Sequence, residues 1–177
     1  MKLRVGIIDY RVGNIGSVAE ALKRLHTRPH IAHTRQDISR SDVLILPGVG
    51  NFAMAMETLR RNHLLAPLQE ALREQCKPVL GICLGMQLFA RSSEEAPGVR
   101  GLNLIDGEVR HLTSETGRIP HTGWTEGSLV EARIRGPGGF PACVRAGNIF
   151  GCQFHPEKSQ ADGERFLRWF LNASRET

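Results

Sequence analysis

A cysteine with a glycine two positions away on either side is the first candidate for chemistry in this chain. Cys83 lies within Gly81-Ile82-Cys83-Leu84-Gly85, directly after the apolar run Pro78-Val79-Leu80. This pattern is typical of a nucleophile elbow, where a strand turns sharply into a helix and holds the nucleophile above the sheet. Because the first turn of a helix favours negative charge, we expect Cys83 to be activated as a thiolate.

The base that a nucleophilic cysteine needs is predicted further along the chain, in His155-Pro156-Glu157. Proline biases the residue before it toward an extended backbone. Side chains at i and i+2 of an extended chain share one face, so Glu157 can orient the imidazole of His155. Cys83, His155 and Glu157 are therefore predicted to form a catalytic triad.

The other three cysteines, Cys76, Cys143 and Cys152, are predicted to be small buried hydrophobic residues. None forms a C-x-x-C pair, so a disulfide framework is not expected. Cys152 and His155 have the spacing of zinc ligands, but no second pair completes a zinc site. No metal site is predicted elsewhere. The alternative for Cys83 itself is an ordinary buried cysteine at the end of a strand.

The loop Pro47-Gly48-Val49-Gly50 follows the strongest predicted strand. It suits a simple strand-ending turn, and it also suits an oxyanion hole. In the second interpretation a main-chain N–H of Val49 or Gly50 acts together with the N–H of Leu84, the residue after the nucleophile. Glycine allows the main chain to approach a ligand closely there.

The same loop also fits a dinucleotide-binding fingerprint, because Gly48 to Ala53 has the form G-x-G-x-x-A. That fingerprint requires an acidic residue about 20 positions further on, at the end of a second strand. The nearest candidate, Glu70, lies in a helical pattern, which disfavours this interpretation.

Short apolar runs alternate with amphipathic segments over the first half of the chain. This alternation predicts an α/β fold with a mostly parallel central sheet and helices on both faces. Beyond residue 95, glycines and prolines separate short β-like pieces, so the C-terminal part is predicted to be β-rich before a final helix. The predicted strands are 3–8, 30–33, 42–46, 78–82, 107–111, 117–121, 129–134, 142–146 and 149–154, and the predicted helices are 14–26, 51–61, 64–76, 84–91 and 161–173.

The 177 residues are predicted to form one domain, with 41% hydrophobic and 23% charged residues. The net charge of +5 is dispersed and no recognised binding motif accompanies it, so no nucleic-acid partner is expected. No apolar stretch approaches the ~18 residues that a membrane span requires. Because residues 1–8 form a core-strand pattern rather than a signal peptide, a cytoplasmic location is expected.

Several stretches together resemble the class I (triad) glutamine amidotransferases, which have a three-layer, flavodoxin-like fold. Within that family, the chain is most similar to the glutaminase subunits of imidazole glycerol phosphate synthase, an enzyme of histidine biosynthesis. The stretches that carry the resemblance are residues 9–14, 77–89, 120–124 and 150–159.

The resemblance implies that Cys83 attacks the side-chain amide carbon of glutamine, with no cofactor, and that Gly50 and Gln87 help to bind the substrate. Ammonia would pass to a (β/α)8-barrel cyclase subunit in a heterodimer, which makes imidazole glycerol phosphate and AICAR. The residues that match family positions at or near that interface and the ammonia path are Asn14, His121, Trp124 and Lys158.

One segment departs from the family pattern. Family members carry a longer stretch after the Gly-Trp pair, whereas here residues 125–138 alone separate Trp124 from the segment that matches again at about Gly139. The family's Phe-Val-His-Ser-Tyr-like motif beside the glutamine site has no visible counterpart. The shortened segment favours one alternative to the implied function, a catalytically weakened paralogue that binds and regulates a partner. A glutaminase of another synthase and a hydrolase that shares the elbow are the alternatives among enzymes.

Overall fold

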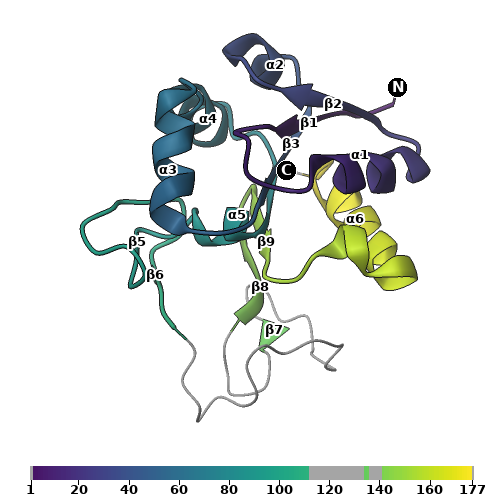
Figure 1. The fold of residues 1–177 in the computed structure, drawn as a ribbon. Helices are drawn as coiled ribbons and strands as arrows, with labels where there is room; N and C mark the ends of the chain where they lie inside the picture. Colours follow the sequence, from purple (N-terminus) through teal and green to yellow (C-terminus); the bar gives the residue numbers. More distant parts are fainter. Residues whose placement is uncertain (1, 112–133, 136–140, 177) are drawn as a thin grey trace.

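A seven-stranded sheet forms the centre of the computed structural model, which describes residues 2–111, 134–135 and 141–176 (Figure 1). The strand order is β2-β1-β3-β4-β9-β8-β7, with parallel pairs from β2 to β9 and antiparallel pairs from β9 to β7. A separate two-stranded pair joins β5 and β6. The strands are β1 Arg4–Ile8, β2 Arg28–Ala32, β3 Val43–Gly48, β4 Val79–Cys83, β5 Ser92–Ser93, β6 Glu108–Val109, β7 Ile134–Arg135, β8 Pro141–Ala146 and β9 Ile149–Cys152.

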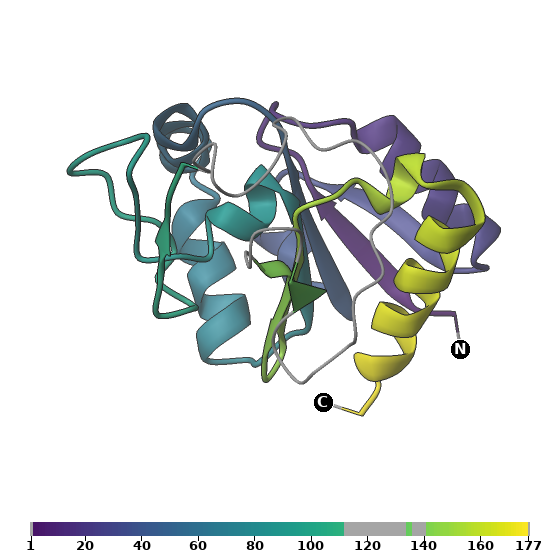
Figure 2. The same ribbon diagram turned by 90° about the horizontal axis from the view of Figure 1, so that it is seen from below.

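Helices cover both faces of this sheet. Figure 2 shows α1 and α6 on one side of it and α3 and α4 on the other. The helices are α1 Ile15–Arg24, α2 Arg35–Ser39, α3 Phe52–Arg61, α4 Leu65–Arg73, α5 Leu84–Gln87 and α6 Gln160–Ala173, with a short 3₁₀ helix, η2, at Pro156–Lys158. Helix–sheet–helix layering is the arrangement expected of a sheet built from crossover connections.

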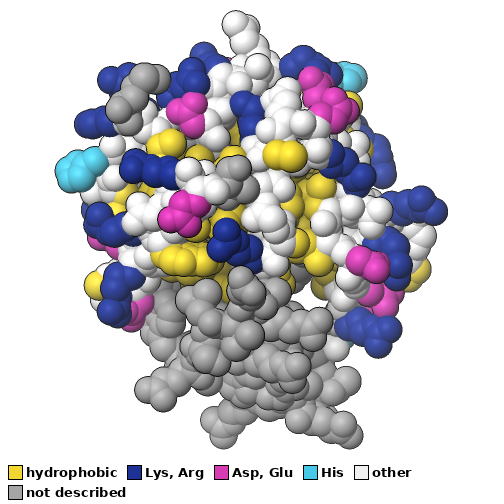
Figure 3. Space-filling model, turned by 180° about the vertical axis from the view of Figure 1, so that it is seen from behind, with side chains coloured by type: hydrophobic (Ala, Val, Ile, Leu, Met, Phe, Trp, Pro, Cys, Tyr) yellow, Lys and Arg dark blue, Asp and Glu magenta, His cyan; other side chains and the backbone are white. Residues whose placement is uncertain are grey.

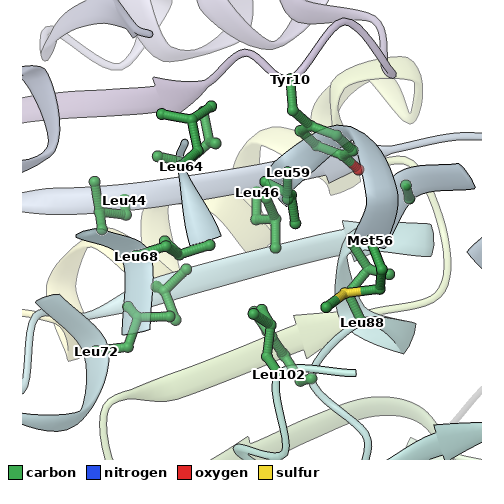
Figure 4. Close-up of a cluster of buried hydrophobic side chains, with 14 of the residues drawn as sticks. Tyr10, Leu44, Leu46, Met56, Leu59, Leu64, Leu68, Leu72, Leu88 and Leu102 are labelled. Carbon is green, nitrogen blue, oxygen red and sulfur yellow. The ribbon is translucent and has the colours of Figure 1, made fainter. Parts of the chain in front are cut away.

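Alternate residues of the central strands point to opposite faces and are buried on both. In β3, Leu44 and Leu46 pack in the core beneath α3 and α4, a cluster that Figure 4 shows with Tyr10 at one end. Val43 and Ile45 of the same strand belong to the second core, together with side chains of α1 and α6. Burial on both faces explains the continuous apolar run in the sequence.

The α/β class and the mostly parallel sheet that the sequence predicts are confirmed. The helix after Cys83 is shorter than predicted, ending at Gln87 instead of Arg91. The segment that follows Gly101 explains this difference, because main-chain N–H groups of Leu102 and Leu104 donate to the carbonyl oxygens of Leu88 and Phe89. The predicted strand 117–121 and most of 129–134 lie outside the described residues.

Charged side chains are mixed over the surface. Figure 3 shows Lys and Arg side chains dispersed around one face and interspersed with Asp and Glu, with hydrophobic side chains toward its middle. None of the described helices is long and apolar enough to cross a membrane.

Candidate active site

The strand β4 turns into α5 with no intervening loop, and Cys83 is the residue at the turn. Its backbone has φ 55° and ψ −114°, a region that residues other than glycine rarely adopt. Such a conformation is strained and persists only where the surrounding structure holds it, commonly at functional sites. The sharp strand-to-helix turn that the sequence predicts at Cys83 is therefore present.

Burial is the largest influence on the Cys83 thiol, and it raises the thiol pKa above its usual value. A hydrogen bond from the Leu84 main-chain N–H lowers the pKa, and so do Gln153 and Lys158, while the Glu157 carboxylate raises it. This direction runs against the thiolate that the sequence predicts, because desolvation disfavours the charged form and outweighs the groups that lower the pKa. A protonated thiol at neutral pH needs a base nearby.

His155 and Glu157 form a pair, with 2.9 Å between His155 Nδ1 and Glu157 Oε1. His155 has an extended backbone, as the following proline predicts. The prediction that the extended segment continues to Glu157 was wrong, because Pro156 and Glu157 lie in η2, so the pair forms across this short turn. The Glu157 side chain is only 2% exposed, whereas that of His155 is 27% exposed. Because Glu157 occupies Nδ1, the other ring nitrogen, Nε2, is the one left for proton transfer.

Two glutamine side chains link this region to the thiol. Gln153 Nε2 lies 3.5 Å from Cys83 Sγ, and Gln153 Oε1 accepts a hydrogen bond of 3.0 Å from Gln87 Nε2. In the part of the chain that the structure describes, no hydrogen bond joins Sγ to His155. Catalytic hydrogen bonds of free enzymes are often long and shorten when substrate binds.

Sequence reasoning missed Gln153, although two signals point to it. Its position two residues before His155 would place both side chains on one face of an extended segment, although the structure bends at residues 153 and 154. In addition, Ile82 of β4 is the register partner of Cys152 in β9, so the next residues along, Cys83 and Gln153, are neighbours. The second signal depends on strand order, which the sequence does not state.

The predicted oxyanion loop begins where β3 ends. Gly48, the last residue of β3, is the register partner of Cys83, so Val49 and Gly50 leave the sheet at the edge where the thiol lies. Val49 is 42% exposed, and Gly50 has a φ of +92° that favours glycine. The next residue, Asn51, caps α3 by accepting a hydrogen bond from the Met54 N–H.

The dinucleotide interpretation of this loop is wrong. Glu70 lies inside α4 and forms an ion pair with Arg35, so no acidic residue stands at the strand end that the fingerprint requires.

The predicted interface residues fall into two groups. Asn14 is exposed and caps α1, with its Oδ1 accepting from the Ser17 N–H at 3.3 Å. Lys158 is exposed in η2 and close enough to Cys83 to lower the thiol pKa. His121 and Trp124 lie outside the described residues.

The remaining cysteines differ from one another. Cys143 and Cys152 are buried, as predicted, and burial raises the pKa of Cys143 to about 12 and that of Cys152 well above its usual value. The prediction for Cys76 was wrong, because it is exposed in the turn after α4, with a φ of +50°. Among the described residues, no group of three or more His, Cys, Asp or Glu could hold a metal ion.

Comparison with known proteins identifies the family. The sequence model of "Glutamine amidotransferase class-I" matches residues 6–136, which include Cys83 and end before His155. This chain belongs to the class I glutamine amidotransferases. It is 39% identical to imidazole glycerol phosphate synthase subunit HisH 2 of Prochlorococcus marinus (strain MIT 9313), over 97% of this chain and 95% of that protein. It is 40% identical to subunit HisH of Bacillus cereus (strain G9842), over 94% and 93%.

Solved structures agree on the fold of this amidotransferase. A crystal structure of a glutamine amidotransferase superposes with a TM-score of 0.77 at 21% identity, covering 96% of this chain and 98% of that one. The structure of PurLQS from Thermotoga maritima matches with a TM-score of 0.67 at 19% identity, covering 98% and 99%.

Proposed function

We propose that this amidotransferase is a glutaminase subunit that hydrolyses L-glutamine to glutamate and ammonia through a thioester on Cys83. The observation that carries the proposal is the position of Cys83 on a strained strand-to-helix turn, with the His155–Glu157 pair close enough for Glu157 to raise the thiol pKa. A nucleophile, a base and a residue that orients the base are the parts that acyl transfer needs.

In the proposed reaction, His155 accepts the thiol proton as Sγ attacks the amide carbon of glutamine. His155 then donates a proton to the departing ammonia and later activates the water that hydrolyses the thioester. Glu157 holds the imidazole in position throughout. We assign stabilisation of the oxyanion to main-chain N–H groups of Leu84 and of Val49 or Gly50, and contacts with glutamine to Gly50 and Gln87.

We further propose that the ammonia passes to a (β/α)8-barrel cyclase subunit of imidazole glycerol phosphate synthase. The support is the similarity to HisH subunits, at 39% and 40% identity over most of both chains. Asn14, Lys158, His121 and Trp124 are proposed to lie at or near that interface.

The test is release of glutamate from glutamine, measured with and without a cognate cyclase subunit. Cys83→Ala should abolish the release, while Cys76→Ser, which alters an exposed cysteine in the turn after α4, should leave it unchanged. A glutamine-like electrophile should label Cys83 ahead of Cys76, Cys143 and Cys152. Turnover that survives Cys83→Ala would remove the catalytic assignment.

A second function, partner binding and regulation with weak catalysis, is favoured by one observation. The alignment with the Prochlorococcus subunit extends over 205 residues, more than the 177 of this chain, so that relative carries residues with no counterpart here. We propose that residues 125–138 are the shortened counterpart of that additional stretch in the relative. Stoichiometric binding to the cyclase without glutamate release under either condition would support this second function.

A further inference from the structure

The carboxamide of Gln153 lies between two polar groups of the site. Its Nε2 is 3.5 Å from Cys83 Sγ, and its Oε1 is 3.0 Å from Gln87 Nε2. The main chain of Gln153 is fixed as well, because its N–H donates to the Ala142 carbonyl oxygen across the β8–β9 ladder at 2.8 Å. The sheet therefore sets the position of this side chain.

The two ends of an amide are chemically different, which makes this arrangement directional. The NH₂ group can only donate and the carbonyl oxygen can only accept. With its NH₂ toward the sulfur, Gln153 presents its oxygen to Gln87, and only the NH₂ group of Gln87 can satisfy that oxygen. Gln87 Oε1 is then left free, and in the described part of the chain it has no other hydrogen bond.

We propose that Gln153 is a positioning residue that fixes the orientation of the Gln87 carboxamide, leaving Gln87 Oε1 as an acceptor for substrate, while it donates a hydrogen bond to the Cys83 sulfur. This inference rests on the proposed glutaminase function. A free acceptor at Gln87 selects a ligand group that carries N–H, such as an ammonium or a primary amide. A carboxylate facing Gln87 Oε1 would be repelled by this oxygen, so the side-chain carboxylate of the product glutamate should bind poorly there.

The hydrogen bond to sulfur has a separate consequence. A donor stabilises the charged form of an acid, so Gln153 favours the thiolate against the effect of burial. Loss of this donor should reduce the reactivity of Cys83 at a fixed pH below the thiol pKa, whether or not glutamine is present.

Two substitutions separate the two roles. Gln153→Glu keeps an oxygen for Gln87 to donate to but puts a carboxylate beside the sulfur. Alkylation of Cys83 by iodoacetamide at pH 8 should slow about tenfold, which corresponds to one pKa unit, with the KM for glutamine within twofold. Gln153→Leu removes both contacts, so alkylation should slow about threefold and the KM should rise about fivefold or more.

The control is Gln75→Glu, which adds the same charge at an exposed position after α4 and should change neither quantity. All variants carry Cys76→Ser, since Cys76 is the exposed cysteine, and alkylation is followed by mass spectrometry of the Cys83 peptide. Thermal unfolding confirms that each variant is folded.

Unchanged alkylation in Gln153→Glu, or an unchanged KM in Gln153→Leu, would overturn the inference. Failure of the proposed function looks different. In that case the wild-type protein neither releases glutamate nor is protected by glutamine against alkylation, while the alkylation rates of the variants still decide whether Gln153 donates to Sγ.

Discussion

Gly48 and Cys83 are register partners on neighbouring parallel strands, so the loop after β3 and the turn after β4 leave the sheet side by side. The end of β3 also packs directly against α5, because a methyl group at Gly48 would lie 3.0 Å from Leu84 Cβ. The carboxyl ends of parallel strands are where α/β proteins assemble sites from segments distant in sequence. Contacts that hold the loop after β3 and the turn after β4 in position should therefore affect the catalytic rate.

Glu95 is the residue that anchors the β3–α3 loop from outside. Its carboxylate accepts hydrogen bonds from Asn51 Nδ2 at 2.8 Å and from the Phe52 N–H at 3.3 Å. We predict that Glu95→Ala lowers the kcat for glutamine hydrolysis about tenfold, less than the ~10²–10³ expected for outright loss of an oxyanion donor. Because Glu95 is exposed, unfolding free energy should fall by no more than about 1 kcal/mol.

Glu94→Ala is the matched control, since the neighbouring Glu94 is also exposed and accepts instead from the His111 N–H. Steady-state kinetics and urea unfolding of both variants check this prediction. Equal kcat values for the two variants would show that the loop does not depend on Glu95.

Gly85 permits the close approach of α5 to β3. A methyl group at this position would overlap the carbonyl oxygen of Leu46, and neither main chain can move aside easily. We predict that Gly85→Ala lowers the unfolding free energy by about 3 kcal/mol or more, the range of severe overpacking. Gly16→Ala in α1, where a methyl group would meet nothing within 4 Å, should instead raise it by about 0.5–1 kcal/mol. Urea unfolding of the pair measures both effects.

Local patterns predicted the elements of the fold but not the contacts between them. The glycines on either side of Cys83 and the proline after His155 are signals that act within a few residues. The structure shows the sharp turn at Cys83 and the extended backbone of His155 that they predict. The Cys83–Gln153 contact depends on β9 lying next to β4, a pairing of segments about seventy residues apart. The raised pKa of Cys83 depends on burial by the assembled fold, which no local pattern states.

Tyr10 is fully buried, and its hydroxyl has no hydrogen-bond partner in the described structure (Figure 4). An unpaired buried hydroxyl is destabilising, because it loses its bonds to water without replacement. We predict that Tyr10→Phe raises the unfolding free energy by about 1 kcal/mol. Thr58→Val should have the opposite effect, since the buried Thr58 hydroxyl donates to the Met54 carbonyl oxygen at 2.7 Å. Chemical denaturation that shows both variants destabilised would contradict the assignment of an unpaired hydroxyl.

Two buried thiols should make the protein less stable in alkali. Burial raises the pKa of Cys143 and Cys152 above the value near 9 expected in the unfolded chain, to about 12 for Cys143. Stability from a raised pKa is complete below the unfolded value and is lost as the pH rises toward the folded one, since the unfolded chain releases its protons first. We predict falling stability from about pH 9 upward, by up to ~1.4 kcal/mol per pH unit for each thiol.

Lys77 has the opposite effect on the pH dependence of stability, because burial lowers the pKa of its amine in the folded protein. The folded protein releases this proton before the unfolded chain does, so this amine makes stability rise as the pH approaches 10.5. One amine does not offset two buried thiols, so the net slope remains negative. Urea midpoints at pH 7.5, 9, 10 and 10.5 measure it. Cys143→Ser removes one buried thiol and should make the slope shallower, whereas Cys76→Ser, at an exposed position, should not. A urea midpoint that stays constant to pH 10.5 would mean that the thiols are not desolvated in the folded protein.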